Sequence, residues 1–149
     1  MTIASTLRLS LCSIAISTLG LIGCSNTDDT ATTDSTTTTD KPAKTLAITQ
    51  IVEHPSLDDM RRGIIDELAD NGYIEGQNLT INFQSAQGNT ATAGQIAKQF
   101  AGDNPDAIVA ISTPSAQSVV ASTTSVPIVY TAVSDPLAAK LINADGTPF

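Results

Sequence analysis

The sequence is poor in the residue types that stack on bases or hold structural metals. Aromatic residues make up 3% of the chain, and tryptophan is absent. A base-stacking surface depends on aromatic side chains, so this composition argues against one. His54 is the one histidine, and the two cysteines, Cys12 and Cys24, both lie in the first 24 residues. The sequence therefore predicts no disulfide across the folded part, no metal site and no cofactor.

Positive charge is also scarce. The chain carries 15 Asp and Glu residues against 7 Lys and Arg residues, a net charge of −8 over 149 residues. Binding to a phosphate backbone requires a basic face, so nucleic acid is an unsuitable partner. The length fits one domain of ordinary size.

Catalytic motifs are missing as well. The sequence contains no G-x-S-x-G, no G-x-G-x-x-G and no P-loop, and a single imidazole offers little for a nucleophile–base pair. These absences indicate that the protein is not an enzyme.

Residues 1–23 have the pattern of a secretory signal. Arg8 precedes an apolar run over residues 9–22, which at about 14 residues is shorter than the roughly 20 needed to span a bilayer. The run ends in Leu21-Ile22-Gly23-Cys24, which resembles the bacterial lipobox, where cleavage leaves a lipid-carrying cysteine. Residues 1–23 are thus predicted to be a lipoprotein signal peptide and Cys24 the lipidation site. A plain signal peptide with a chance cysteine is the alternative.

Residues 24–44 are predicted to link Cys24 to a folded domain. They are rich in Thr and Asp and have almost no large apolar side chain, so folding could not offset their ordering entropy. Acyl chains on Cys24 would hold the protein to a membrane, since each buried CH₂ contributes about 0.8 kcal/mol. We expect an exported, lipid-anchored protein whose folded part covers residues 45–149.

The central feature of the folded part is an apolar strand that leads into a helix. Residues 107–111 are apolar without a break, which is typical of a strand covered on both faces. Ser112-Thr113-Pro114 follows, and proline suits the first turn of a helix. This predicts Thr113 as the N-cap of a helix that begins at Pro114.

Strands and helices alternate along the rest of the folded part. Ser56 is expected to cap the first helix, and Asn89 or Thr90 the second. Further strands are predicted over residues 46–52, 79–83 and 127–133, and helices over 56–70, 90–101 and 137–142. Residues 79–83 alternate apolar and polar, so this strand should lie at an edge. Right-handed crossovers then give an α/β fold, an open parallel sheet of order 2-1-3-4 with helices on both faces.

Three segments of the sequence carry a resemblance to a known family. They read ITQIVEHPSLDDMRRGIIDELADNGYIEGQNLTINFQSAQG, IAISTPSAQSVV and VPIVYTAVSDPLAAKLI. They resemble the tryptophan/tyrosine-type branch of bacterial ABC-transporter substrate-binding proteins, whose motifs are G/S-T-P-A/S-A-Q and IPIVF-A-V-T/S-D-P-V/L. The resemblance runs over about residues 45–142 and implies one Rossmann-like lobe of a two-lobed type I periplasmic-binding-protein fold. The remaining strand of that lobe and the second lobe are not in the sequence, which suggests a truncated or split product, or a fragment.

The resemblance also implies which residues contact the ligand, at the bends that follow the strands. They are Glu53, His54, Pro55, Leu57, Ser85, Gln87, Thr113, Pro114, Ser115, Ala116, Val133, Ser134 and Asp135. The helix start at Thr113 suits a carboxylate, and Asp135 could pair with an ammonium group. Two alternatives stay open, since Asp135 could only cap a helix that starts at Pro136 and His54 could only shape a turn.

Two functions from different classes fit these observations. The first is a lipid-anchored solute-binding component of an ABC importer, with an amino acid-like ligand and ABC permease subunits as partners. The second is a lipid-anchored surface or scaffold protein with no small-molecule ligand.

Overall fold

The computed structural model describes residues 41–147. The predicted signal peptide, Cys24 and the linker up to residue 40 lie outside the described residues. Within the described range, no helix has the length and apolar character that crossing a membrane requires.

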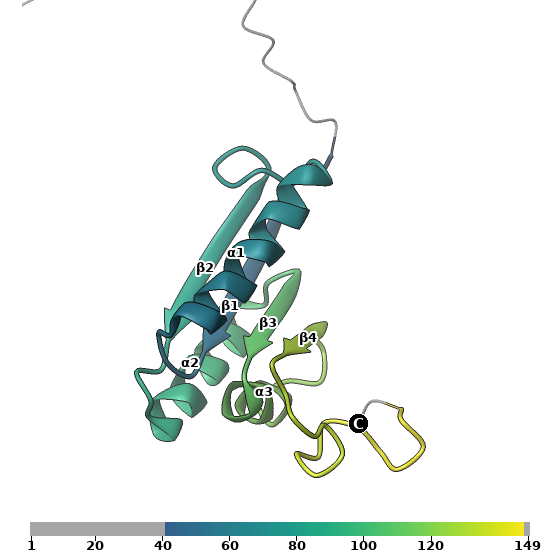
Figure 1. Ribbon diagram of the computed structural model, residues 1–149. Coiled ribbons are helices and arrows are strands. Elements are labelled where there is room, and N and C mark those ends of the chain that lie inside the picture. The colour runs from purple at the N-terminus through teal and green to yellow at the C-terminus, as the bar shows by residue number, and fades with distance from the viewer. Residues whose placement is uncertain (1–40, 148–149) are drawn as a thin grey trace, which may run out of the picture. The chain divides into compact units, whose positions relative to one another are not determined.

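Four parallel strands form one sheet (Figure 1). They are β1 (Lys44–Gln50), β2 (Leu79–Ser85), β3 (Ala107–Ile111) and β4 (Ile128–Thr131). Their order is β2-β1-β3-β4, with Ile48 of β1 opposite Phe83 of β2 and Val109 of β3. The predicted order and the edge position of the alternating strand are therefore confirmed.

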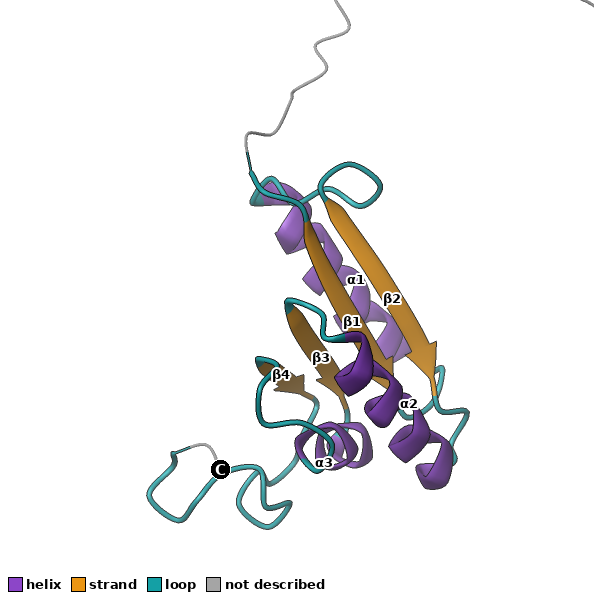
Figure 2. Ribbon diagram, turned by 180° about the vertical axis from the view of Figure 1, so that it is seen from behind, coloured by secondary structure: helices purple, strands orange, loops and turns teal. Residues whose placement is uncertain are grey.

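Helices cover both faces of the sheet, as expected (Figure 2). One face carries α1 (Pro55–Asp70), and the other carries α2 (Thr90–Asp103) and α3 (Thr113–Val120). The strand residues alternate between two apolar clusters: Leu46 and Ile48 belong to the α1 side, Ala47 and Ile108 to the side of α2 and α3. Both faces of the two central strands are buried, which explains why β3 is apolar at every position.

Two helix N-caps differ from the prediction by one or two residues. The N-cap of α1 is His54, whose Nδ1 accepts the Ser56 N–H at 3.3 Å, rather than Ser56 itself. The N-cap of α3 is Ser112 rather than Thr113. In both helices the proline lies within the first turn, so the cap falls before the residue that the hydroxyl pattern favoured. Asn89 caps α2, one of the two residues expected there.

The helix expected over residues 137–142 is wrong. This segment makes successive turns, with the Ala139 N–H donating to the Asp135 carbonyl and the Leu141 N–H to the Pro136 carbonyl. Lys140 has φ of 56°, a left-handed conformation that ends any helix after one turn. The Gln117 amide donates to the Ala139 carbonyl at 3.1 Å and holds the turns against α3.

Candidate ligand-binding site

Because all four strands are parallel, their carboxyl ends lie together at one end of the sheet, which we call the carboxyl edge or, in this part, the edge (Figure 1). The bends that follow β1, β2, β3 and β4 start at this edge. Ligands of open α/β sheets bind beyond the carboxyl ends of the strands, where the strand order reverses. Here β1 and β3 are the neighbours on either side of that reversal.

The bends after β1 and β2 are held together by hydrogen bonds. The Gln87 Nε2 donates to Glu53 Oε1 at 3.0 Å, and both side chains are exposed. Below them, the Gly88 N–H donates to the Ile51 carbonyl at 2.6 Å. Two predicted contact residues from separate segments therefore meet at the edge.

The bend after β3 contains a strained residue. Ser112 has φ of 94° and ψ of 155°, a region that residues other than glycine rarely occupy, at a cost of about 1–3 kcal/mol. Its N–H donates to the Thr131 carbonyl at 2.9 Å, and its hydroxyl lies 3.4 Å from the Ser115 hydroxyl. Such strain persists only where the surrounding structure fixes it, and it is concentrated at functional sites.

The predicted contact residues in α3 differ in exposure. Ser115 and Ala116 are fully buried, whereas Thr113 and Pro114 are half-buried at the edge. Only the first two residues of α3 are therefore within reach of a solute at this edge. The helix offers N–H groups there, together with the partial positive charge of its N-terminus.

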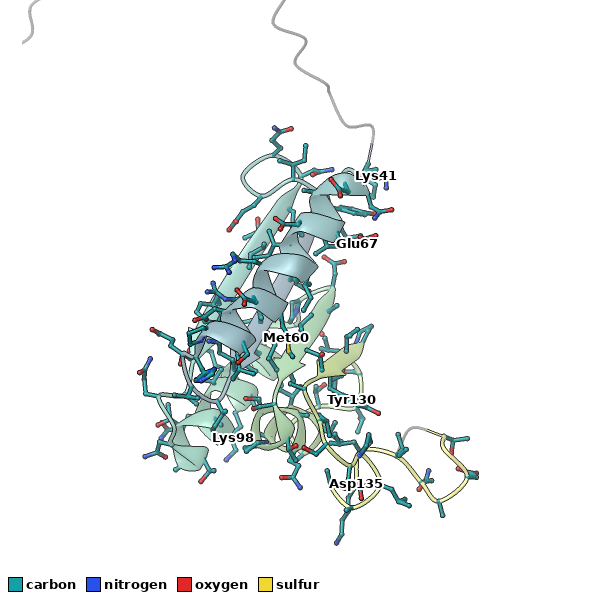
Figure 3. The ribbon with its side chains drawn as sticks, in the orientation of Figure 1. Lys41, Met60, Glu67, Lys98, Tyr130 and Asp135 are labelled. Atoms are coloured by element: carbon teal, nitrogen blue, oxygen red, sulfur yellow. The ribbon has the colours of Figure 1, made fainter. Side chains whose placement is uncertain are left out.

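The bend after β4 carries the predicted acidic residue. Asp135 is exposed (Figure 3), and its Oδ1 accepts the Ala138 N–H at 2.9 Å. Asp135 thus caps the turn that follows it, whereas the alternative from the sequence was the cap of a helix starting at Pro136. Ser134 is exposed and Val133 is half-buried.

Comparison with known proteins identifies the family. A family model described as "ABC transporter substrate binding protein" matches residues 45–148. The chain belongs to this family.

Two relatives of this chain have names or titles that refer to an amino acid. A "Tyrosine-binding protein" from Clostridioides difficile is 45% identical over 125 residues, which cover 83% of this chain and 36% of that protein. A ligand-free, open substrate-binding protein with adhesive properties from Clostridium difficile superposes with a TM-score of 0.67 and 49% identity, over 68% of this chain and 35% of that one. A Streptococcus pneumonia ABC domain solved with L-Trp has a TM-score of 0.64 and 34% identity, over 67% and 34% of the two chains.

The chain spans about a third of the length of these relatives. The relatives are substrate-binding proteins rather than enzymes. In the part of the chain that the structure describes, no group of three or more His, Cys, Asp or Glu side chains could hold a metal ion.

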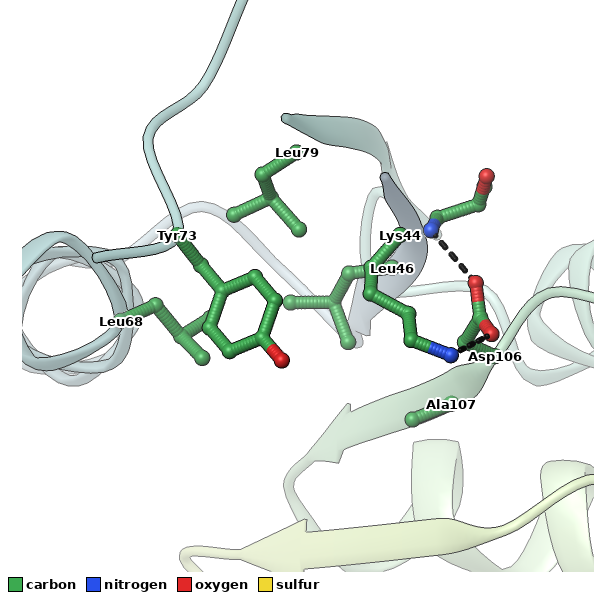
Figure 4. A pocket seen from close by; sticks show the side chains of 8 residues that line it. Lys44, Leu46, Leu68, Tyr73, Leu79, Asp106 and Ala107 are labelled. Carbon is green, nitrogen blue, oxygen red and sulfur yellow. Dashed lines mark hydrogen bonds and ion pairs between the residues drawn. The ribbon is translucent and has the colours of Figure 1, made fainter. Parts of the chain in front are cut away.

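One cavity lies at the amino ends of β1, β2 and β3, opposite the bends. Figure 4 shows the side chains that line it. Its volume is about 270 Å³, and Leu46, Leu68, Tyr73, Leu79 and Ala107 give it an apolar lining. At its rim Lys44 Nζ lies 2.7 Å from Asp106 Oδ1, while Asp106 Oδ2 accepts the Thr45 N–H at 2.8 Å. These bonds join the amino ends of β1 and β3, so we read this feature as part of the packing of the sheet.

Sequence reasoning missed one polar pair near the carboxyl ends of the strands. Gln50, the last residue of β1, is fully buried, and its amide contacts Asp58 of α1. The signal was available, because Thr49-Gln50 interrupts an otherwise apolar strand.

Proposed function

We propose that this chain is the N-terminal, ligand-contacting lobe of an extracytoplasmic solute-binding protein that serves an ABC importer. The observation that carries the proposal is the gathering of polar bends along the carboxyl edge of a parallel sheet, with strained Ser112 at the strand reversal. Open sheets of this kind bind ligands at that position.

An amino acid is the ligand that best fits the chemistry of the bends. The first turn of α3 offers N–H groups and positive partial charge to a carboxylate. Glu53 and Asp135 provide exposed carboxylates that can pair with an ammonium group. The tyrosine and tryptophan in the names of two relatives support the same class of ligand.

We further propose that Cys24 carries the lipid that holds this protein to a membrane, where permease subunits would meet it. Replacing Cys24 with Ala should abolish metabolic labelling of the chain by a fatty acid. Labelling that persists in Cys24→Ala would contradict the anchor without touching the binding proposal.

Thermal melting with a ligand panel tests the binding proposal. The full chain is melted with saturating amino acids, and with the matching amines and carboxylic acids as controls. A ligand present at about 100 times its Kd stabilises the native state by roughly 2.7 kcal/mol, so the correct amino acid should raise the Tm by several degrees. The matching amine and acid should not. If no amino acid moves the Tm, a surface or scaffold role becomes the better account.

A further inference from the structure

The carboxyl end of β1 contains a buried polar side chain that the proposed ligand contacts do not use. Gln50 has no exposed surface, although its neighbours along the chain, Ile51 and Val52, are partly exposed. A buried amide is costly unless it is hydrogen-bonded. The NH2 group of Gln50 has two acceptors, whereas Oε1 has no hydrogen-bond partner among the described residues.

Both N–H groups of the Gln50 amide have acceptors. Nε2 donates to the Val52 carbonyl at 3.1 Å and to Asp58 Oδ1 at 2.9 Å. These partners fix the orientation of the amide, since the opposite orientation would point its oxygen at two other acceptors. One side chain therefore joins the end of β1, the following turn and the first part of α1.

Asp58 continues the network toward the edge strand. Its carboxylate also accepts from Arg61 Nη2 at 3.3 Å, and the Arg61 guanidinium lies 4.0 Å from the centre of the Phe83 ring on β2. The pKa of Asp58 is held below its ordinary value, first by the Gln50 hydrogen bond and then by Arg61, while partial burial opposes the shift. The carboxylate that receives the amide is therefore charged at neutral pH, which strengthens the hydrogen bond.

The turn between Gln50 and α1 carries two of the predicted ligand contacts. It includes Glu53, which bonds to Gln87, and His54, the N-cap of α1. Gln50 donates to the Val52 carbonyl in the middle of this turn and to the Asp58 carboxylate in α1, just beyond it. Among the described residues, no other side chain donates to the Val52 carbonyl.

We propose that Gln50 is a positioning residue for the candidate site, which holds the turn of residues 51–54 so that Glu53 and His54 face the edge. The inference rests on the proposed function for its effect on ligand affinity. Its effect on the turn itself does not depend on any ligand.

Three variants of the full chain separate positioning from core packing. Gln50→Met removes both donors at similar volume. Gln50→Met combined with Asp58→Leu also removes the carboxylate that would lose its amide donor and keep only Arg61, and replacing both members of a polar pair can be nearly neutral for stability. Gln84→Leu is the matched control, because Gln84 lies opposite Thr49 in the register and so points to the other face of the sheet.

Hydrogen exchange is the first measurement. The N–H groups of Leu57 and Asp58 donate to the His54 carbonyl and report on the start of α1. We expect them to exchange about tenfold faster in Gln50→Met and also in the double variant, while the Ala121 N–H at the end of α3 and the Gln84→Leu control keep the wild-type rate. If the double variant regains both the wild-type Tm and the wild-type exchange, Gln50 is a core residue only and the proposal is overturned.

Ligand affinity is the second measurement. For the amino acid that raises the wild-type Tm, we expect about a tenfold weaker Kd in both Gln50→Met variants, including the one whose Tm is restored. An unchanged Kd would overturn the positioning role. If no amino acid shifts the wild-type Tm, the proposed function has failed, and the exchange experiment still decides whether Gln50 holds the turn.

Discussion

Ser112 combines a side chain with a backbone conformation that glycine adopts more readily. Its φ of 94° and ψ of 155° place it where a Cβ atom is strained, at the point where β3 becomes α3. The motif of the resembling family has Gly or Ser at this position, so a small residue satisfies the same bend. The hydroxyl of Ser112 donates a hydrogen bond to that of Ser115, a contact that glycine could not make.

Ser112→Gly should stabilise the chain. The relief of about 1–3 kcal/mol of strain exceeds the roughly 0.5–1 kcal/mol that glycine costs through the unfolded state. We expect a net gain on the order of 1 kcal/mol in the free energy of unfolding, measured by urea denaturation. Ser112→Ala is the control, since it removes the hydroxyl but keeps the Cβ. Equal stability of the two variants would show that the backbone at Ser112 stores no strain.

The ion pair at the opposite end of the sheet predicts a dependence on pH. The pKa of Asp106 is lowered from 3.8 by hydrogen bonds from Lys44 and from the Thr45 N–H, and the pKa of Lys44 is raised from 10.5 by Asp106. The carboxylate stabilises the fold above pH 3.8, and this contribution is lost as pH falls through the lowered folded pKa. The ammonium stabilises below pH 10.5, and this contribution is lost as pH rises through the raised folded pKa.

Asp106→Asn is therefore expected to be less stable than the wild type near pH 7, and the difference should shrink toward about pH 3. Urea denaturation at both pH values measures it. Both side chains are partly exposed, so added salt should shrink the difference as well. A stability difference that stays constant over this range would mean that the pair contributes nothing beyond packing.

At the scale of the elements, β1, β2 and β3 each pass into a helix through a short bend, and the cap decides where the helix begins. Asn89 caps α2 through its Oδ1, which accepts the N–H groups of Ala91 at 2.8 Å and Thr92 at 3.1 Å. This helix buries Ile96 and Phe100 against the sheet, so its N-terminus is tied to the core.

Asn89→Ala should cost about 1 kcal/mol of the free energy of unfolding, since an N-cap side chain contributes roughly 0.5–2 kcal/mol. Urea denaturation checks the value. Thr90→Ala, one residue along and exposed, makes a similar truncation without removing the cap. A loss of the same size in Thr90→Ala would show that Asn89 is not the residue that caps α2.

Elements with strong apolar patterns could be predicted from the sequence, whereas the exact caps and the last segment could not. The unbroken run of β3 matches its burial, and the alternating β2 lies at the edge of the sheet where its pattern places it, although its burial does not alternate residue by residue. The expected helix over 137–142 is wrong because Lys140 adopts a left-handed φ, and the sequence has no glycine at that position to indicate it. The caps at His54 and Ser112 were missed because each lies just before the hydroxyl residue that looked like the better cap.

Contacts between bends were beyond the reach of the sequence. The sequence predicts that Glu53 and Gln87 each follow a strand, but their hydrogen bond depends on the register of β1 against β2. The same holds for the bond between Gln50 and Asp58, which depends on how α1 crosses the sheet. The ligand contacts implied by the family resemblance remain predictions.

At the scale of the whole described domain, the two faces of the sheet are covered unequally. Two helices cover one face and one covers the other (Figures 1 and 2). Beside α1, a cavity of about 730 Å³ is lined by residues that include Met60 of α1 and Tyr130 of β4 (Figure 3). Val129 lines it too and is 57% exposed, although it lies in a strand.

Val129 and Tyr130 of β4 and Met60 of α1 form what we call the apolar strip. Because it includes an edge strand, it predicts self-association of the 149-residue chain. Exposed apolar edge strands favour pairing between molecules, and a lysine there opposes it. We expect sedimentation velocity to show larger species as concentration rises, and Val129→Lys to shift the population toward the monomer. Leu137→Lys is the control, since Leu137 is also exposed but lies outside this strip. If both variants behave alike, net charge rather than the strip controls association.

The position of β1 determines how the domain responds to a mechanical pull. The chain enters the domain at Lys41–Lys44, and β1 lies between β2 and β3 with parallel partners on both sides. A force applied between the preceding residues and the carboxyl ends of the strands therefore runs along β1 and loads its hydrogen bonds in shear, all at once, instead of opening them one at a time. Under tension from its N-terminal side, the domain should resist extension more strongly than its modest size suggests, and the force at rupture should follow the rate of unfolding rather than the equilibrium stability.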